Sequence, residues 1–304
     1  MKIPVRNIKS LPWPATPFGI IGGSGAYKLL SEGVLGKEVD CVVLQTPFGN
    51  SNPLHRYDLD GMEYIFISRH GEKDYAMTAP YVNYRANIYA LKASGVERVI
   101  SWSGPGIIDT AFKPGEFVVP HDIIDETRNR ESTFFKNRGV GFIRQNEPFC
   151  PHIRLALHNS LHSGSYTHHE QAVYVCTEGP RLETPAEIRK MRVLGGQLVG
   201  MTLAPESFLA RELELCYAPI CYLTNYAEGV MSREFIGGEL FEGMQTARER
   251  GRVELAMGRF PRILADAFAA LAGFERTCQC RDALKRYKNK GMIGEDWRGW
   301  FEDS

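Results

Sequence analysis

The chain has 304 residues, of which 43% are hydrophobic and 24% charged, and its 36 basic residues equal its 36 acidic residues. A chain of this length and composition can bury a substantial core, and it lacks the overall basic field that favours nucleic acid or a membrane surface. No apolar run approaches the roughly 20 residues that a membrane-spanning helix needs, and four prolines among the first 17 residues leave no recognisable secretory signal. The seven scattered cysteines are typical of reduced thiols in the cytoplasm.

Strands and helices are predicted to alternate along the chain. Short apolar runs that end in glycine or polar residues predict strands, and longer segments with apolar residues at helical spacing predict helices. The predicted strands cover residues 18–23 (ending in a glycine turn), 42–44, 64–68, 98–101, 117–119, 123–124, 172–177, 198–201 and 218–224. The predicted helices cover residues 81–94, 153–162, 185–194 (capped by Thr184), 205–214 and 239–272, the last as one long helix or a pair.

This alternation predicts an α/β fold in which one domain contains a mixed central β-sheet flanked by helices. The predicted boundaries are an irregular lead-in over residues 1–17, the domain over 18–274 and a C-terminal extension over 275–304. The extension is polar and ends in aromatic residues, so we expect it to pack on the surface or at a subunit contact. Its Cys278 and Cys280 are interpreted as incidental thiols or as a redox or stapling pair.

Four polar segments follow predicted strands, where ligands bind in open α/β sheets. They are GGSG at 22–25, SRHG at 68–71, SGPG at 103–106 and GMTLAPE at 200–206. Each alone has an ordinary interpretation, such as a tight turn, a surface arginine or a helix cap. Together they supply an arginine, a histidine that can donate once oriented, three hydroxyls and several glycine amides, a set that suits a phosphate dianion. The dinucleotide-binding fingerprint is not met, because its third glycine would fall at Lys28.

Two further strand ends carry groups that suit a purine. Glu183 precedes a predicted helix and Asn225 ends a predicted strand. A 6-oxopurine presents a carbonyl acceptor beside a ring N–H donor, and a carboxylate and a carboxamide complement that pair. A capping carboxylate and a turn asparagine are the ordinary interpretations. No HExxH motif, paired CxxC or carboxylate cluster predicts a metal site.

Seven ordered motifs extend this pattern to a family resemblance: GIIGGSG, TPFG, SRHG, VNYRANIYALK, EPFCP, TEGPRLET and GMTLAPE. The chain resembles the trimeric purine nucleoside phosphorylases, most closely the branch that includes methylthioadenosine phosphorylases. The resemblance implies phosphate contacts from Ser24, Arg69, His70, Ser103, Gly104 and Thr202. It implies that Met201 packs against the sugar and that Glu183 and Asn225 hold the base, with Asn225, His70 and Glu183 as the catalytic group. It also implies a homotrimer or dimer of trimers in which Phe142 closes a neighbour's sugar site, and no cofactor besides the co-substrate phosphate.

The base site separates the subgroups of this family. The methylthioadenosine enzymes carry Ser at the position of Glu183 and Asp at those of Asn225 and Ala227, so the resemblance implies phosphorolysis of inosine, guanosine or methylthioinosine. Three alternatives stay open at this point. One is a methylthioadenosine phosphorylase, and another is a non-catalytic nucleoside- or phosphate-binding protein, since Trp102 and Pro105 are unusual beside the third polar segment. The third, a dinucleotide-binding oxidoreductase, is disfavoured by the glycine spacing. Residues 229–240 are expected to line the site of the sugar 5′ group, and His55 is considered as a sugar contact or a surface residue.

Overall fold

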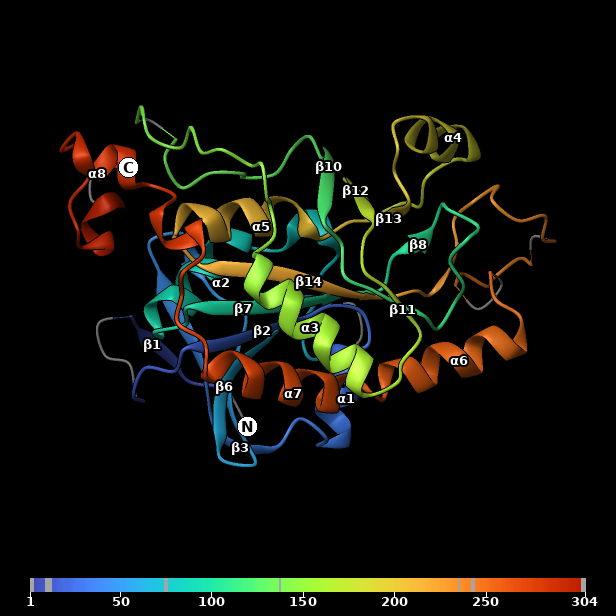
Figure 1. Ribbon diagram of the computed structural model, residues 1–304, viewed down its shortest axis with the longest axis horizontal. Helices are drawn as coiled ribbons and strands as arrows, with labels where there is room; N and C mark the ends of the chain where they lie inside the picture. The colour runs from blue at the N-terminus through green and yellow to red at the C-terminus, as the bar shows by residue number, and fades with distance from the viewer. Residues whose placement is uncertain are drawn as a thin grey trace.

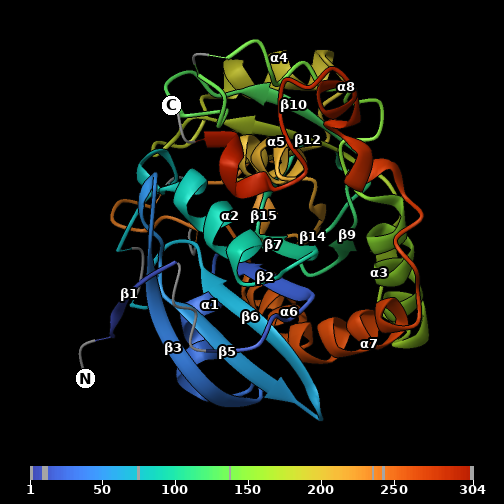
Figure 2. The ribbon, with the colours of Figure 1, turned by 90° about the vertical axis from the view of Figure 1, so that its left-hand side faces the viewer.

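The computed structural model describes residues 3–8, 13–73, 76–136, 138–234, 236–241 and 244–301. Within these ranges the chain forms an α/β fold, as predicted, but its strands divide between two sheets (Figure 1, Figure 2). In spatial order the larger sheet consists of β1 (Val5–Asn7), β3 (Lys37–Thr46), β5 (Leu54–Leu59), β6 (Met62–Ser68), β2 (Phe18–Gly22), β7 (Arg98–Ser103), β14 (Cys216–Tyr222), β9 (Phe117–Val118) and β11 (His168–His169), with β4 (Gly49–Asn50) paired to β3. The smaller sheet consists of β10 (Asp122–Glu126), β12 (Val173–Thr177), β13 (Leu198–Gly200), β8 (Gly106–Ile107) and β15 (Asn225–Tyr226).

Helices pack around the two sheets. They are α1 (Ala26–Glu32), α2 (Tyr84–Ala93), α3 (Pro151–Ser163), α4 (Pro185–Val193), α5 (Leu203–Glu212), α6 (Ala247–Met257), α7 (Phe260–Ala272) and α8 (Lys285–Asn289), with 3₁₀ turns η1 (Ala79–Tyr81), η2 (Gln279–Asp282) and η3 (Trp297–Phe301). Figure 1 shows α2 and α5 on one side of the central strands and α3 and α7 on the other. Every residue of β2, β7 and β14 is buried for this reason, so these strands show no alternation of buried and exposed residues.

The direction of the central strands determines where polar loops meet. Strand β2 pairs in parallel with β6 and β7, and β7 pairs in parallel with β14. The carboxyl ends of these four strands therefore open at the same edge of the sheet, which is where side chains from distant segments can form one site.

Most predicted elements occur with shifted ends, and the exceptions have physical reasons. The helical pattern over 239–272, expected as one long helix or a pair, forms a pair, because Gly258 caps α6 and Pro261 lies in the first turn of α7. The first of the two helices starts later than predicted, at Ala247, and residues 242–243 lie outside the described ranges. Thr184 caps α4 as predicted, in a capping box with Glu187. The prediction missed α1, α8, β5 and the short strands β1, β4, β8, β11 and β15.

Both ends of the described chain are tied to the domain. The lead-in, expected to be irregular, contains β1, which pairs in parallel with β3. In the extension Trp300 and Phe301 are buried, and the Phe301 ring centroid lies 5.5 Å from that of Phe134 and 5.7 Å from that of Phe48. The extension therefore packs against the domain by an aromatic cluster. Among the described residues, no helix combines the length and the apolar character needed to cross a membrane.

Candidate active site

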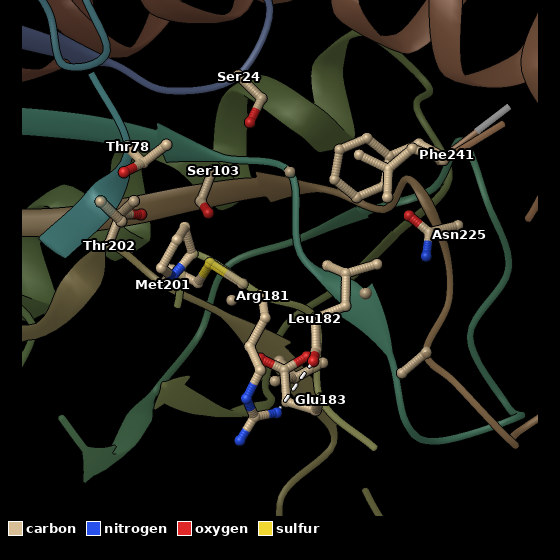
Figure 3. Close-up of a pocket in the computed structure, with 18 of the residues that line it drawn as sticks. Ser24, Thr78, Ser103, Arg181, Leu182, Glu183, Met201, Thr202, Asn225 and Phe241 are labelled. Atoms are coloured by element: carbon tan, nitrogen blue, oxygen red, sulfur yellow. Dashed lines mark hydrogen bonds between the residues drawn. The ribbon is translucent and has the colours of Figure 1, made fainter. Parts of the chain in front are cut away.

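One pocket, of about 420 Å³, collects loops from both sheets. Its walls come from the segments that follow β2, β6 and β7 in the larger sheet and β12 and β13 in the smaller one, together with β15 (Figure 3). Nine of the ten residues predicted for the site line it: Ser24, Arg69, His70, Ser103, Gly104, Glu183, Met201, Thr202 and Asn225. The fold thus brings the separately interpreted polar segments to one place.

Arg69 is held rigidly at the pocket by a buried carboxylate. Its Nε and Nη2 donate to the two carboxylate oxygens of Glu206, each at 2.7 Å, and both side chains are at most 2% exposed. Glu206 also accepts a hydrogen bond from the Tyr217 hydroxyl at 2.6 Å. A two-pronged contact of this kind fixes the plane of the guanidinium, so the cation meets the pocket in one orientation.

The glycine turn after β2 passes very close to this arginine. A Cβ atom at Gly23 would lie 2.4 Å from the Trp102 carbonyl oxygen and 2.9 Å from Arg69 Nη1, which only glycine avoids. The next residue, Ser24, accepts hydrogen bonds at its backbone oxygen from Trp102 Nε1 at 3.4 Å and from the Tyr222 hydroxyl at 2.9 Å. Trp102, unusual at this position in the sequence, is thus a buried support for the turn.

His70 lines the pocket as a neutral imidazole. Its Nδ1 lies 2.9 Å from the Met77 carbonyl oxygen, and since a carbonyl only accepts, Nδ1 carries the hydrogen. Burial, together with the neighbouring Arg69, lowers the pKa of His70 to about 4. Nε2 is therefore an acceptor at neutral pH, whereas the sequence analysis expected His70 to act as a donor.

Hydroxyl groups gather on one side of the pocket. Figure 3 shows those of Thr78, Ser103 and Thr202 close together. The Ser103 hydroxyl lies 3.2 Å from that of Tyr174, whereas Thr202 Oγ1 is buried without a hydrogen-bond partner among the described residues and does not cap α5. Tyr174 also approaches Thr202, but only its contact with Ser103 has hydrogen-bond geometry. A buried hydroxyl without a partner is costly, and a bound oxyanion would satisfy it.

A carboxylate and a carboxamide lie away from these hydroxyls. Glu183 is buried, its Oε1 accepts from Thr177 Oγ1 at 2.5 Å, and burial raises its pKa. Asn225 is also buried, and its Nδ2 donates to the Tyr226 carbonyl at 3.0 Å while Oδ1 accepts from Thr224 at 2.8 Å. The pocket therefore offers an acceptor and an oriented amide, the groups that the sequence analysis matched to a 6-oxopurine.

A positioning residue absent from the predicted set is Arg130, which joins the two loops that carry Glu183 and Thr202. Its Nη1 donates to the carbonyls of Met201 at 2.5 Å and Ala204 at 2.7 Å. Its Nη2 donates to the carbonyls of Thr177 at 3.0 Å and Glu178 at 2.6 Å. No local pattern around Arg130 indicates this role, because its partners are side by side only in the fold.

Two residues considered as sugar contacts lie outside this pocket, and two residues that were not predicted line it. Phe142 does not line this pocket and is 87% exposed. His55 is buried between Glu38 and Glu72, at 2.6 and 2.5 Å, so it is neither a sugar contact in this pocket nor a surface residue. Within the segment expected to line the 5′ site, Leu240 does so, and its neighbours Phe241 and Met244 add to the same wall.

The fold and the pocket define an α/β protein with a pocket that is lined by a fixed arginine, hydroxyl groups, a carboxylate and a carboxamide. A family model described as the phosphorylase superfamily matches residues 17–251, so the chain belongs to the phosphorylase superfamily.

Named relatives agree with this membership. The chain is 40% identical over 267 residues to a probable S-methyl-5′-thioinosine phosphorylase of Methanothermobacter thermautotrophicus, covering 88% of each chain. It is 40% identical over 273 residues to a 6-oxopurine nucleoside phosphorylase of Pyrococcus furiosus, covering 88% of this chain and 97% of the relative. Among solved structures, it is similar to a methylthioadenosine phosphorylase of Schistosoma mansoni, with a TM-score of 0.78, 27% identity and coverage of 89% and 96%.

Proposed function

We propose that the protein cleaves the glycosidic bond of purine nucleosides with inorganic phosphate, and that 6-oxopurine nucleosides are its preferred substrates. The products are the free base and the sugar 1-phosphate. One observation carries the proposal: a single pocket is lined by a fixed arginine, by a group of hydroxyls that lie close together, and by a carboxylate and a carboxamide that lie away from those hydroxyls. The names of the relatives from Methanothermobacter and Pyrococcus, which both refer to 6-oxopurine bases, support it.

The arginine side suits phosphate. Arg69 supplies a fixed positive charge, and Ser24, Ser103 and Thr202 supply hydroxyl donors. Because Nδ1 of His70 is committed to the Met77 carbonyl, its Nε2 accepts the hydrogen of a protonated phosphate oxygen. A phosphate held in this way satisfies the Thr202 hydroxyl and faces the sugar beside Met201.

The other side suits the base. The Glu183 carboxyl group accepts the ring N–H of a 6-oxopurine, and Asn225 Nδ2 turns from the Tyr226 carbonyl to donate to the purine. An adenine-type base, which has an acceptor nitrogen where the 6-oxopurine has a donor, leaves Glu183 facing a lone pair. Leaving a buried polar group unpaired in this way is what gives such sites their selectivity.

The reaction follows from holding both substrates in one pocket. The bond between C1′ and the purine nitrogen breaks, its electron pair passes to the purine, and the sugar becomes oxocarbenium-like. Asn225 stabilises the negative charge on the departing base, a phosphate oxygen forms the new bond to C1′, and the base takes a proton from solvent. Fixing both reactants removes up to roughly 7–11 kcal/mol of the barrier.

Four finer predictions accompany the proposal. We expect no metal or organic cofactor in the reaction, a role in purine salvage, a cytoplasmic location, and a homotrimer or dimer of trimers. The exposed Phe142 is available to close the sugar site of a neighbouring subunit. A panel of nucleosides distinguishes a sugar with a 5′ hydroxyl from one with a methylthio group.

The test is a panel of inosine, guanosine, S-methyl-5′-thioinosine, adenosine and methylthioadenosine, assayed for base release with and without phosphate. We expect release only with phosphate, and a kcat/KM for the preferred 6-oxopurine nucleoside about a hundredfold or more above that of its 6-amino counterpart. Phosphate-independent release, or equal rates on both bases, would contradict the proposal. Preference for methylthioadenosine would instead support the alternative that the protein is a methylthioadenosine phosphorylase.

The base contacts are tested by exchanging carboxamide and carboxylate. Asn225→Asp should lower kcat on inosine by about 10²–10³-fold, because a donor to the leaving group is lost. Glu183→Gln should raise the KM for inosine, because the ring N–H loses its charged acceptor. Asn159→Asp, an exposed change on α3 remote from the pocket, is the matched control. Unchanged inosine turnover by Asn225→Asp would remove Asn225 from the mechanism.

A further inference from the structure

Four cysteines from three distant segments meet in the interior, outside the active-site pocket. Cys150 precedes α3, Cys216 begins β14, and Cys278 and Cys280 lie at η2 in the C-terminal extension. All four are buried, and their sulfur atoms lie within 4.8 Å of one another. None of the four lines the pocket. The fold thus forms a compact four-sulfur cluster to which the proposed reaction assigns no role.

The sulfur separations match those of a tetrahedral metal site. Cys278 Sγ lies 3.8 Å from Cys150 Sγ and 3.4 Å from Cys216 Sγ. In a tetrahedral zinc site with zinc–sulfur bonds of about 2.3 Å, neighbouring sulfurs are about 3.8 Å apart. One ion therefore fits among these thiols without a rearrangement of the backbone.

The charges around the cluster favour thiolates. Arg211 Nη1 donates to Cys280 Sγ at 3.3 Å, and this arginine is buried. Arg276 lies beside Cys216 and is anchored by a 2.7 Å hydrogen bond from its Nη2 to the Glu214 carbonyl. Zinc with four thiolates carries a net charge of roughly −2, which two guanidiniums balance. Two neutral disulfides would leave the buried Arg211 beside uncharged sulfur, and burying unbalanced charge is unfavourable, whereas Arg276 also has a carboxylate partner, Glu97, at 3.5 Å.

We propose that Cys150, Cys216, Cys278 and Cys280 together bind one zinc ion with a structural role. On binding, the four thiols release their protons and the four sulfurs complete the tetrahedral shell. A site with four protein ligands has no open position for a substrate, so it stabilises the fold rather than taking part in catalysis. The ion joins the C-terminal extension to the start of α3 and to β14.

Nothing local in the sequence predicts this site. The sequence motifs predict no metal site, and from the sequence Cys278 and Cys280 are interpreted as incidental thiols or as a redox or stapling pair. The two contacts above join residues separated by 128 and 62 positions, far from the spacing of the paired CxxC motifs that indicate zinc. Only the packing of the extension brings the ligands together.

The first test measures metal and thiols on the same preparation. The full chain is purified anaerobically without reductant, its zinc is quantified, and its thiols are counted after denaturation with a chelator. We expect one zinc per chain and all seven cysteines as thiols. Two disulfides among the four would leave three of the seven thiols and no zinc, and would overturn the proposal. Seven thiols with neither bound zinc nor uptake of added Zn²⁺ or Co²⁺ would also overturn it.

Variants then assign the metal to these residues. Cys280→Ala should lower the bound zinc about tenfold or more, while Cys221→Ala, a buried cysteine of β14 outside the cluster, should leave it unchanged. Arg211→Met, which keeps all four ligands, should weaken zinc binding about 10–100-fold, as loss of an outer-shell partner does. Chelation of the wild-type protein should speed tryptic cleavage between Arg281 and Lys290. Equal zinc in Cys280→Ala and Cys221→Ala would place the metal elsewhere.

Discussion

Replacing Glu206 by glutamine tests how the arginine of the active site is held. In the native protein the Glu206 carboxylate accepts two hydrogen bonds from Arg69 at 2.7 Å and one from the Tyr217 hydroxyl at 2.6 Å. Glutamine keeps the size of the side chain but removes its charge and one acceptor. Arg69, which is 0% exposed, then has no anionic partner in this network.

The expected cost follows from burial. Removing one partner of a buried ion pair destabilises a protein by about 3–5 kcal/mol, because the remaining charge stays desolvated. Arg69→Met should cost a similar amount for the opposite reason, since it leaves the Glu206 carboxylate buried. The double variant contains no charge at this position, so it should lose less than the sum of the single variants, by about 0.5–3 kcal/mol.

The assay is urea unfolding of the wild type, the two single variants and the double variant at neutral pH, with phosphate absent. Asp266→Asn, which removes the exposed contact between Arg262 and Asp266, is the matched control and should leave the unfolding midpoint unchanged. In steady-state assays Glu206→Gln should raise the KM for phosphate more than that for inosine, because the guanidinium loses its fixed direction. Additive losses in the cycle, or a Glu206→Gln protein as stable as the wild type, would refute the reasoning.

Three other predictions concern the surroundings of the site. Because the folded pKa of His70 lies near 4 and its unfolded value near 6.5, the unfolded state binds more protons between these values. The His70 contribution to stability is therefore complete above pH 6.5 and should fall by about 3 kcal/mol as the pH drops to 4. Arg130→Lys should lower the unfolding free energy by about 2–3 kcal/mol and raise the KM of both substrates, because an ammonium cannot reach four carbonyls. Trp300→Ala should cost about 3–5 kcal/mol, since its side chain is 2% exposed.

Each of these predictions has its own measurement. The unfolding free energy of wild type and of His70→Asn is measured across the pH range, and the difference between the two curves gives the His70 effect. A difference is needed because burial raises the pKa of Glu212 to about 7, which changes stability with pH in the opposite direction. Parallel curves for the two proteins would contradict the prediction. For Arg130, unchanged kinetics in a destabilised variant would leave it a purely structural residue. For Trp300, a loss below about 1 kcal/mol in chemical denaturation would mean that the extension is not packed as described.

The local sequence determines the strands of the core and the chemistry of the loops that follow them. Apolar runs such as Phe18–Gly22 have no polar face, so they predict buried strands, and glycine or polar residues mark where those strands end. The residue types of SRHG and GMTLAPE indicate an anion site wherever the fold places them. Capping of α4 by Thr184 is likewise a matter of neighbouring residues.

Tertiary structure alone decides which of these groups meet. Arg69 and Glu206 are 137 positions apart, and no periodic pattern in the sequence indicates that the Glu206 carboxylate binds the Arg69 guanidinium. The division of the strands into two sheets, the four carbonyls bound by Arg130 and the four-sulfur cluster have the same origin. Local patterns reflect the conformation of a few neighbouring residues, whereas each of these contacts depends on the packing of segments that only the whole fold brings together.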